Sequence, residues 1–230
     1  FFPHRNLLVQ LTGVLAMACM SLSMLLALRP RWLEQWLDGL DKMYRLHKWL
    51  GIGALVISTL HWLAAKGPKW AVGWGWLERP HKGAGAVQPP LEAFLTSQRG
   101  TAASMGEWAF YAAVILIALA LIKRFPYRLF YQSHRLLTFV YLVLVVHSLV
   151  LLKFSYWSSP VGWLTAVLLA IGSWAAVKSL LRQLGTKRQV PGSITGLHYF
   201  SGGKSLEVES QVPNWPGHQP GQFAFVISDT

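Results

Sequence analysis

Four histidines lie inside two apolar stretches of the sequence, and their spacing is the feature that most directly indicates chemistry. His47 and His61 are 14 residues apart in the first stretch, and His134 and His147 are 13 residues apart in the second. Burying an ionisable side chain in a membrane-length helix is costly, so such residues generally have a function. Imidazole is also a common metal ligand. Two helices that each carry an upper and a lower histidine can therefore ligate two metal centres at different depths.

The composition indicates a membrane protein. Of the 230 residues, 53% are hydrophobic and 13% are charged, whereas soluble domains have about 25% charged residues. The net charge of +12 does not indicate nucleic-acid binding, because the basic residues lie between apolar stretches and form no patch. The single cysteine, Cys19, excludes a cysteine-ligated cluster. We therefore expect the lipid bilayer as a partner and no nucleic acid.

Five apolar stretches are long enough to cross a bilayer. The first has 22 residues without a charge (7–28), and at about 1.5 Å per residue it spans the roughly 30 Å hydrocarbon core. The others are residues 44–65, 106–122, 134–152 and 161–181. Residues 66–105, rich in Gly, Pro and Trp, are predicted to be a long connection, and Ser158-Ser159-Pro160 is a start signal for the fifth span. The sequence therefore predicts an all-α membrane bundle with five visible spans.

Basic residues predict how these spans are oriented. They are concentrated in the loops after the first and third spans and in the tail after the fifth, which the positive-inside rule places in the cytoplasm. The N-terminus of the chain is then outside, so we expect a sixth span before Phe1. The pattern predicts a multi-pass protein of the cell membrane, of the bacterial inner-membrane type.

The composition changes near residue 190. Residues 192–200, 205–212 and 222–228 alternate partly between apolar and polar side chains and are predicted to be strands, with turns at Gly202-Gly203 and at 213–217. Three strands do not complete a domain. We therefore predict a transmembrane domain over residues 1–187, followed at 188–230 by the start of a cytoplasmic antiparallel β-barrel that continues beyond Thr230.

The two histidine-bearing spans, the second and the fourth, run parallel because one antiparallel helix separates them. The first histidine of each span then lies at one depth in the membrane and the second histidine of each span at the other. This pairs His47 with His134 and His61 with His147. Fourteen residues rise about 21 Å, which suits two stacked haems. Zinc usually needs three or four clustered protein ligands, whereas two imidazoles per haem suit electron transfer. Cytoplasmic basic loops precede His47 and His134, so theirs is the predicted inner pair and the other is the outer pair.

The two histidine spacings, 14 and 13 residues, predict different directions for the side chains around their helices. At about 100° per residue, fourteen residues return nearly to the same face of a helix, but thirteen leave His147 roughly 140° away from His134. Either the fourth span is kinked or wound more tightly, or its two macrocycles sit at different azimuths. For any one histidine alone, an ordinary role in hydrogen bonding between helices is also open.

Three neighbouring residues are candidates for contact with the haems. Lys48 and Arg135 lie beside the inner histidines and suit haem propionates, although the positive-inside rule also accounts for them. Tyr141 lies seven residues after His134, at mid-depth. It can lie between the macrocycles, but plain packing is favoured.

The chain resembles the ferric reductase and NADPH oxidase superfamily of transmembrane reductases. The resemblance rests on the spacing of the four histidines, on Leu-His-Lys-Trp-Leu-Gly from Leu46 and on Ser-His-Arg-Leu from Ser133. It continues in Gly-His-Gln-Pro-Gly-Gln-Phe-Ala-Phe from Gly217, which resembles the opening of a ferredoxin-reductase-type FAD barrel and includes Gln222.

This resemblance implies an electron path. Cytoplasmic NAD(P)H would reduce FAD, and two b haems held by the four histidines would carry electrons to an extracytoplasmic acceptor. The acceptor would be oxygen, giving superoxide, or a ferric chelate. Residues beyond Thr230 would bind most of the FAD, with Gln222 as a contributor, and the nicotinamide as well.

Two alternatives are open. The superfamily also contains haem b membrane subunits that lack a flavin domain and supply electrons to a periplasmic partner for methionine sulfoxide repair, although the strands after residue 190 disfavour this version. A non-enzymatic transporter or membrane anchor could instead use the four histidines as a proton relay.

Overall fold

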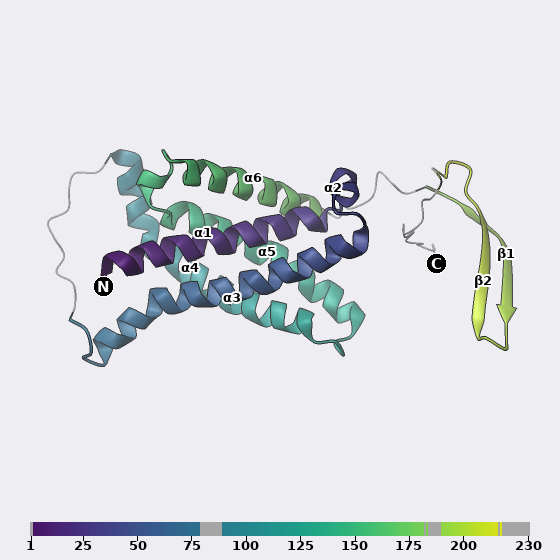
Figure 1. Ribbon diagram of the computed structural model, residues 1–230, viewed down its shortest axis with the longest axis horizontal. Helices are drawn as coiled ribbons and strands as arrows, with labels where there is room; N and C mark the ends of the chain where they lie inside the picture. The colour runs from purple at the N-terminus through teal and green to yellow at the C-terminus, as the bar shows by residue number, and fades with distance from the viewer. Residues whose placement is uncertain (1, 79–88, 182, 184–189, 216, 218–230) are drawn as a thin grey trace. The chain divides into compact units, whose positions relative to one another are not determined.

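The computed structural model of the chain, drawn in Figure 1, describes residues 2–78, 89–181, 183, 190–215 and 217. It divides into two compact units, residues 1–182 and 183–230. The first unit is helical and the second contains a small sheet. The predicted boundary, with the transmembrane domain ending at residue 187 and the next domain beginning at residue 188, stays a prediction.

The helical unit contains five long helices among its described residues. Each is long and apolar enough to cross a membrane, and together they confirm the predicted five-span bundle. They are α1 (Phe2–Ala27), α3 (Leu40–Gly73), α4 (Pro90–Leu121), α5 (Tyr127–Leu151) and α6 (Pro160–Leu180). A short helix α2 (Arg31–Trp36) follows α1, and a 3₁₀ turn η1 (Phe154–Tyr156) precedes α6.

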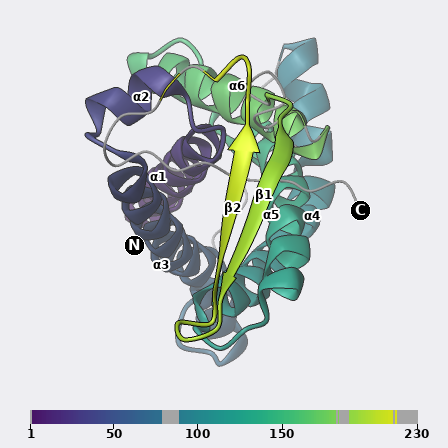
Figure 2. The same cartoon turned by 90° about the vertical axis from the view of Figure 1, so that its right-hand side faces the viewer.

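The five long helices surround the interior of this unit, as the end view in Figure 2 shows. Helix α1 packs against α3 and α6, α4 packs against α5, and α3 and α4 touch less extensively. The buried core joins α1, α4, α5 and α6 and is rich in small side chains, including Ala109, Ala113 and Ala176. Small residues let membrane helices approach closely, where no hydrophobic effect drives them together.

Tyr141 is part of this core. Its side chain is 3% exposed, and its hydroxyl lies 2.9 Å from the Ser21 hydroxyl of α1. Gly172 of α6 provides the room, because a Cβ at this position would overlap the tyrosine hydroxyl. Tyr141 therefore ties α5 to α1 and α6, the packing role that its sequence position favoured.

The predicted connection over residues 66–105 is wrong in extent. Helix α3 continues to Gly73, and α4 begins at Pro90, so a large part of this segment is helical. Likewise, α5 begins at Tyr127, seven residues before the predicted start at His134. Proline misled the sequence interpretation: Pro89-Pro90 begins a helix here, since a proline at the first helical position loses no backbone hydrogen bond. The predicted start of α6 is confirmed, with the Ser159 hydroxyl accepting from the Gly162 amide.

Helix α3 continues through Pro68, and a side chain from α1 supplies the hydrogen-bond donor that the proline lacks. A proline inside a helix cannot donate to the carbonyl four residues earlier, which here belongs to Ala64. Arg5 of α1 supplies the missing donor: its Nε donates to the Ala64 carbonyl at 3.2 Å, and its Nη2 donates to the Ala65 carbonyl at 3.0 Å. The last turns of α3 therefore depend on a side chain far away in the sequence.

We expect Arg5→Leu to lower the free energy of unfolding by about 1–3 kcal/mol, the usual cost of leaving a buried polar group unpaired. In a Pro68→Ala background the restored amide bonds to Ala64, so the same substitution should cost less. Thermal unfolding in detergent of the four proteins in this cycle measures the difference. An equal loss in both backgrounds would mean that Arg5 does not compensate for Pro68.

The second unit contains a two-stranded antiparallel sheet. Strand β1 (Ser193–Phe200) pairs with β2 (Ser205–Gln211), and Phe200 lies opposite Ser205. The register shifts between Ile194 and Gly196. These strands confirm the first two predicted ones, but the described strands do not close a barrel. The third predicted strand, residues 222–228, lies outside the described residues.

Candidate functional site

The structure brings the four histidines together in two pairs, both formed between α3 and α5. The ring centroids of His47 and His134 are 5.9 Å apart, and the ring planes are inclined at 61°. Those of His61 and His147 are 6.4 Å apart, and their planes are inclined at 80°. We call them the inner pair and the outer pair, after their predicted sides of the membrane.

These separations leave room for one metal atom in each pair. Imidazole nitrogens bind first-row metals at about 2 Å. Two such bonds, with roughly 1 Å from each nitrogen to the centre of its ring, separate the centroids by about 6 Å. The observed distances of 5.9 Å and 6.4 Å are close to this value.

Backbone carbonyls hold three of the four rings by Nδ1. His47 bonds to the Ser23 carbonyl at 3.0 Å and His61 to the Val9 carbonyl at 3.0 Å. His147 bonds to the Ala102 carbonyl at 2.8 Å. A carbonyl oxygen only accepts, so the proton of each neutral ring is on Nδ1 and the Nε2 lone pair is free to bind a metal.

Helix α1 provides these acceptors to both histidines of α3 in one register. Val9 and Ser23 are 14 residues apart on α1, as His47 and His61 are on α3. Because the two helices run antiparallel with equal spacings, the contact between His47 and Ser23 recurs fourteen residues away between His61 and Val9. The 14-residue spacing therefore fits the packing of α1 against α3 as well as the two depths.

A small residue four positions after each accepting carbonyl makes room for the ring. A helical carbonyl bonds to the amide of residue i+4, so that residue lies beside it. The residue is Gly13 after Val9, and Gly106 after Ala102. A Cβ on Gly106 would overlap the His147 ring, and one on Gly13 would lie 3.1 Å from the His61 Cε1 atom. After Ser23 the corresponding residue is Ala27. The sequence interpretation missed these positions, although isolated glycines in apolar stretches were a signal for close approach.

His134 differs from the other three histidines. Its Nδ1 atom is buried without a hydrogen-bond partner, and its ring stacks on Phe130 at 5.1 Å. Helix α5 is α-helical at every residue, so the 13-residue spacing turns His134 about 140° from His147. His147 reaches the Ala102 carbonyl of α4, whereas the His134 ring stacks on Phe130 of its own helix. Helix α5 is continuous across both histidines, so no more tightly wound 3₁₀ segment lies between them.

A cavity of about 850 Å³ lies beside the outer pair. This is within the range of small-molecule and cofactor sites, roughly 300–1,000 Å³. His61 and His147 line it together with apolar side chains such as Met17, Phe110 and Leu144. Seven charged residues also line it: Arg5, Lys66, Lys69, Glu92, Arg99, Glu107 and Lys153.

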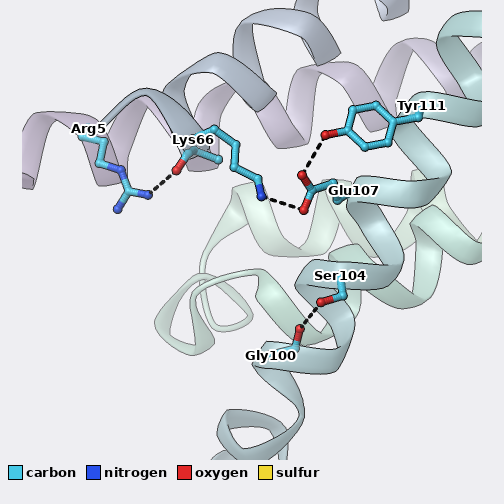
Figure 3. A network of polar contacts seen from close by, with 7 residues as sticks. Arg5, Lys66, Gly100, Ser104, Glu107 and Tyr111 are labelled. Carbon is cyan, nitrogen blue, oxygen red and sulfur yellow. Dashed lines mark hydrogen bonds and ion pairs between the residues drawn. The ribbon is translucent and has the colours of Figure 1, made fainter. Parts of the chain in front are cut away.

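A polar network crosses from α3 to α4 at this cavity (Figure 3). The Lys66 Nζ atom lies 2.6 Å from Glu107 Oε2, and the Tyr111 hydroxyl donates to Glu107 Oε1 at 2.8 Å. Nearby, Trp62 stacks on Phe110 with ring centroids 5.6 Å apart. These contacts join α3 and α4, which touch each other less extensively than α4 and α5 do, at the cavity that His61 lines.

The other predicted site residues are less informative. Lys48 is exposed, and Arg135 Nη2 donates to the Leu180 carbonyl at 3.4 Å, at the end of α6. A contact of either residue with haem propionates stays a prediction. Gln222 lies outside the described residues.

The described residues fit haem better than a metal held by protein ligands alone. Within the described ranges, no three His, Cys, Asp or Glu residues gather closely enough to hold a metal ion. Each histidine pair offers two nitrogen ligands, and a haem macrocycle supplies the other four that complete its iron site. The cavity beside the outer pair also fits a flat group placed against His61 and His147.

The fold and the site together define a multi-pass helical membrane protein with two histidine pairs at different depths. The model of one family, described as "Ferric reductase like transmembrane component", matches residues 12–145, more than half of the chain. The chain belongs to this family and is accordingly of the transmembrane oxidoreductase class. No curated protein matches it.

Proposed function

We propose that this chain is the membrane part of a reductase that passes electrons from cytoplasmic NAD(P)H, through FAD and two b haems, to an acceptor on the other side of the membrane. The acceptor would be oxygen, giving superoxide, or a ferric chelate, giving ferrous iron. The observation that carries the proposal is the meeting of His47 with His134 and of His61 with His147, ring to ring, at two depths.

The spacing of the two sites supports transfer across the bilayer. Fourteen residues of α3 rise about 21 Å, which is most of the roughly 30 Å hydrocarbon core. When bound, haem b supplies a carrier of single electrons at each depth. The chain holds the two sites at this separation on rigid helices and fixes three imidazole rings by their Nδ1 protons.

The same hydrogen bonds disfavour the proton-relay alternative. A relay needs groups that both take up and release protons. The Nδ1 atoms of His47, His61 and His147 donate to backbone carbonyls, which do neither at physiological pH. Proton transfer along the histidines would therefore stop at these carbonyls, whereas ligation through Nε2 uses the arrangement as it stands.

The test is to follow haem reduction in a purified protein that includes the proposed flavin and nicotinamide domains. Anaerobic addition of NADH or NADPH should produce the absorption bands of reduced haem b. Admission of oxygen or of a ferric chelate should then reverse them, and the faster reaction identifies the acceptor. A protein that contains flavin but shows no haem bands would contradict the proposal, as would haem bands that neither nucleotide reduces.

A further inference from the structure

Thr12 of α1 gives His61 a second hydrogen-bond acceptor. The Thr12 Oγ1 atom lies 3.2 Å from His61 Nδ1, and the side chain is buried, with 7% exposed. The Thr12 hydroxyl proton is already donated to the Leu8 carbonyl at 2.7 Å. Oγ1 therefore accepts from His61, and the Nδ1 proton is shared between Thr12 and the Val9 carbonyl.

This contact makes the two histidine pairs unequal. The outer pair has three acceptors for its two Nδ1 protons: Val9 O, Thr12 Oγ1 and Ala102 O. The inner pair has one, the Ser23 carbonyl, because Nδ1 of His134 has no partner. An acceptor at Nδ1 makes an imidazole a more basic ligand, and hydrogen bonds to ligands are among the groups that tune a redox potential. A more basic ligand favours ferric over ferrous iron.

We propose that Thr12 is a positioning residue that lowers the midpoint potential of the outer haem through His61. The inference rests on the proposed function, since it needs a haem at the outer pair. The Thr12 acceptor is a side-chain oxygen, whereas the other Nδ1 acceptors are backbone carbonyls that a substitution does not remove. Thr12 is thus the one Nδ1 acceptor, among the described residues, that a single substitution can delete.

The test is an optical redox titration of the purified wild-type protein and of three variants. Thr12→Val keeps the size of the side chain but removes the acceptor, so one of the two haem transitions should shift to higher potential while the other stays in place. Thr12→Ser keeps the hydroxyl and should titrate like the wild type. Thr59→Val is the matched control, because the Thr59 hydroxyl also donates to the carbonyl four residues earlier, that of Leu55, and both haem transitions should stay in place.

A His147→Ala background identifies the transition that moves. It removes a ligand of the outer haem, so Thr12→Val should leave the remaining transition unchanged. Two haems with unchanged potentials in Thr12→Val would overturn this inference and leave the proposed function standing, as would a shift that persists with His147→Ala. Absence of haem from the wild-type protein would instead overturn the proposed function itself.

Discussion

The double variant His61→Ala/His134→Ala should bind no haem, whereas His61→Ala/His147→Ala should bind one. The first removes one ligand from each pair, so both centres lose a ligand. The second removes both ligands of the outer pair and leaves the inner pair intact. Haem content per chain, measured by the pyridine haemochrome method, distinguishes the two proteins, although each lacks two histidines.

Electron delivery should follow the same pattern. Replacing His61 or His147 by alanine should lower the rate at which the acceptor is reduced by more than about 100-fold. Losing even a residue that only supports a metal ligand costs about 10–100-fold in activity. His4→Ala is the matched control: this exposed histidine of α1 belongs to neither pair, and both haems should remain. Equal haem content in the two double variants would show that the histidines do not pair by depth.

Gly106→Ala should halve the haem content by expelling the outer haem. The added methyl group would overlap the His147 ring, which cannot retreat without losing its 2.8 Å bond to the Ala102 carbonyl. Because glycine is the weaker helix former by up to about 1 kcal/mol, the substitution should not harm α4 itself. The lost haem would come from the displaced ring alone.

Gly100→Ala on the same helix is the control for this variant. Nothing lies within 4 Å of a Cβ at that position, so both haems should stay. The two proteins carry the same chemical change six residues apart. If Gly106→Ala retained two haems with unaltered spectra, the contact between α4 and His147 would have no part in holding the outer site.

The sequence predicted the histidine pairs because their cost in an apolar helix is visible residue by residue. Counting spans was enough to pair His47 with His134 and His61 with His147. The Nδ1 acceptors were not predictable in this way, since every residue has a backbone carbonyl. The sequence indicates two of these acceptor positions only indirectly, through Gly13 and Gly106, whose missing side chains leave room for the His61 and His147 rings.

The helix ends show a second limit of the sequence interpretation. Gly67-Pro68 was read as part of a connection, because a proline normally interrupts a helix. Its compensation by Arg5 depends on α1 packing beside α3, which local sequence does not encode. The third predicted strand and Gln222 lie outside the described residues, so the flavin side of the electron path stays a prediction.

The central claim is that two histidine pairs hold two b haems, and haem stoichiometry tests it most directly. Purified full-length protein should contain two haems per chain, with a reduced-minus-oxidised spectrum of b type. The single variants His47→Ala, His61→Ala, His134→Ala and His147→Ala should each contain one. A wild-type protein without haem, or single variants that keep both haems, would contradict the account.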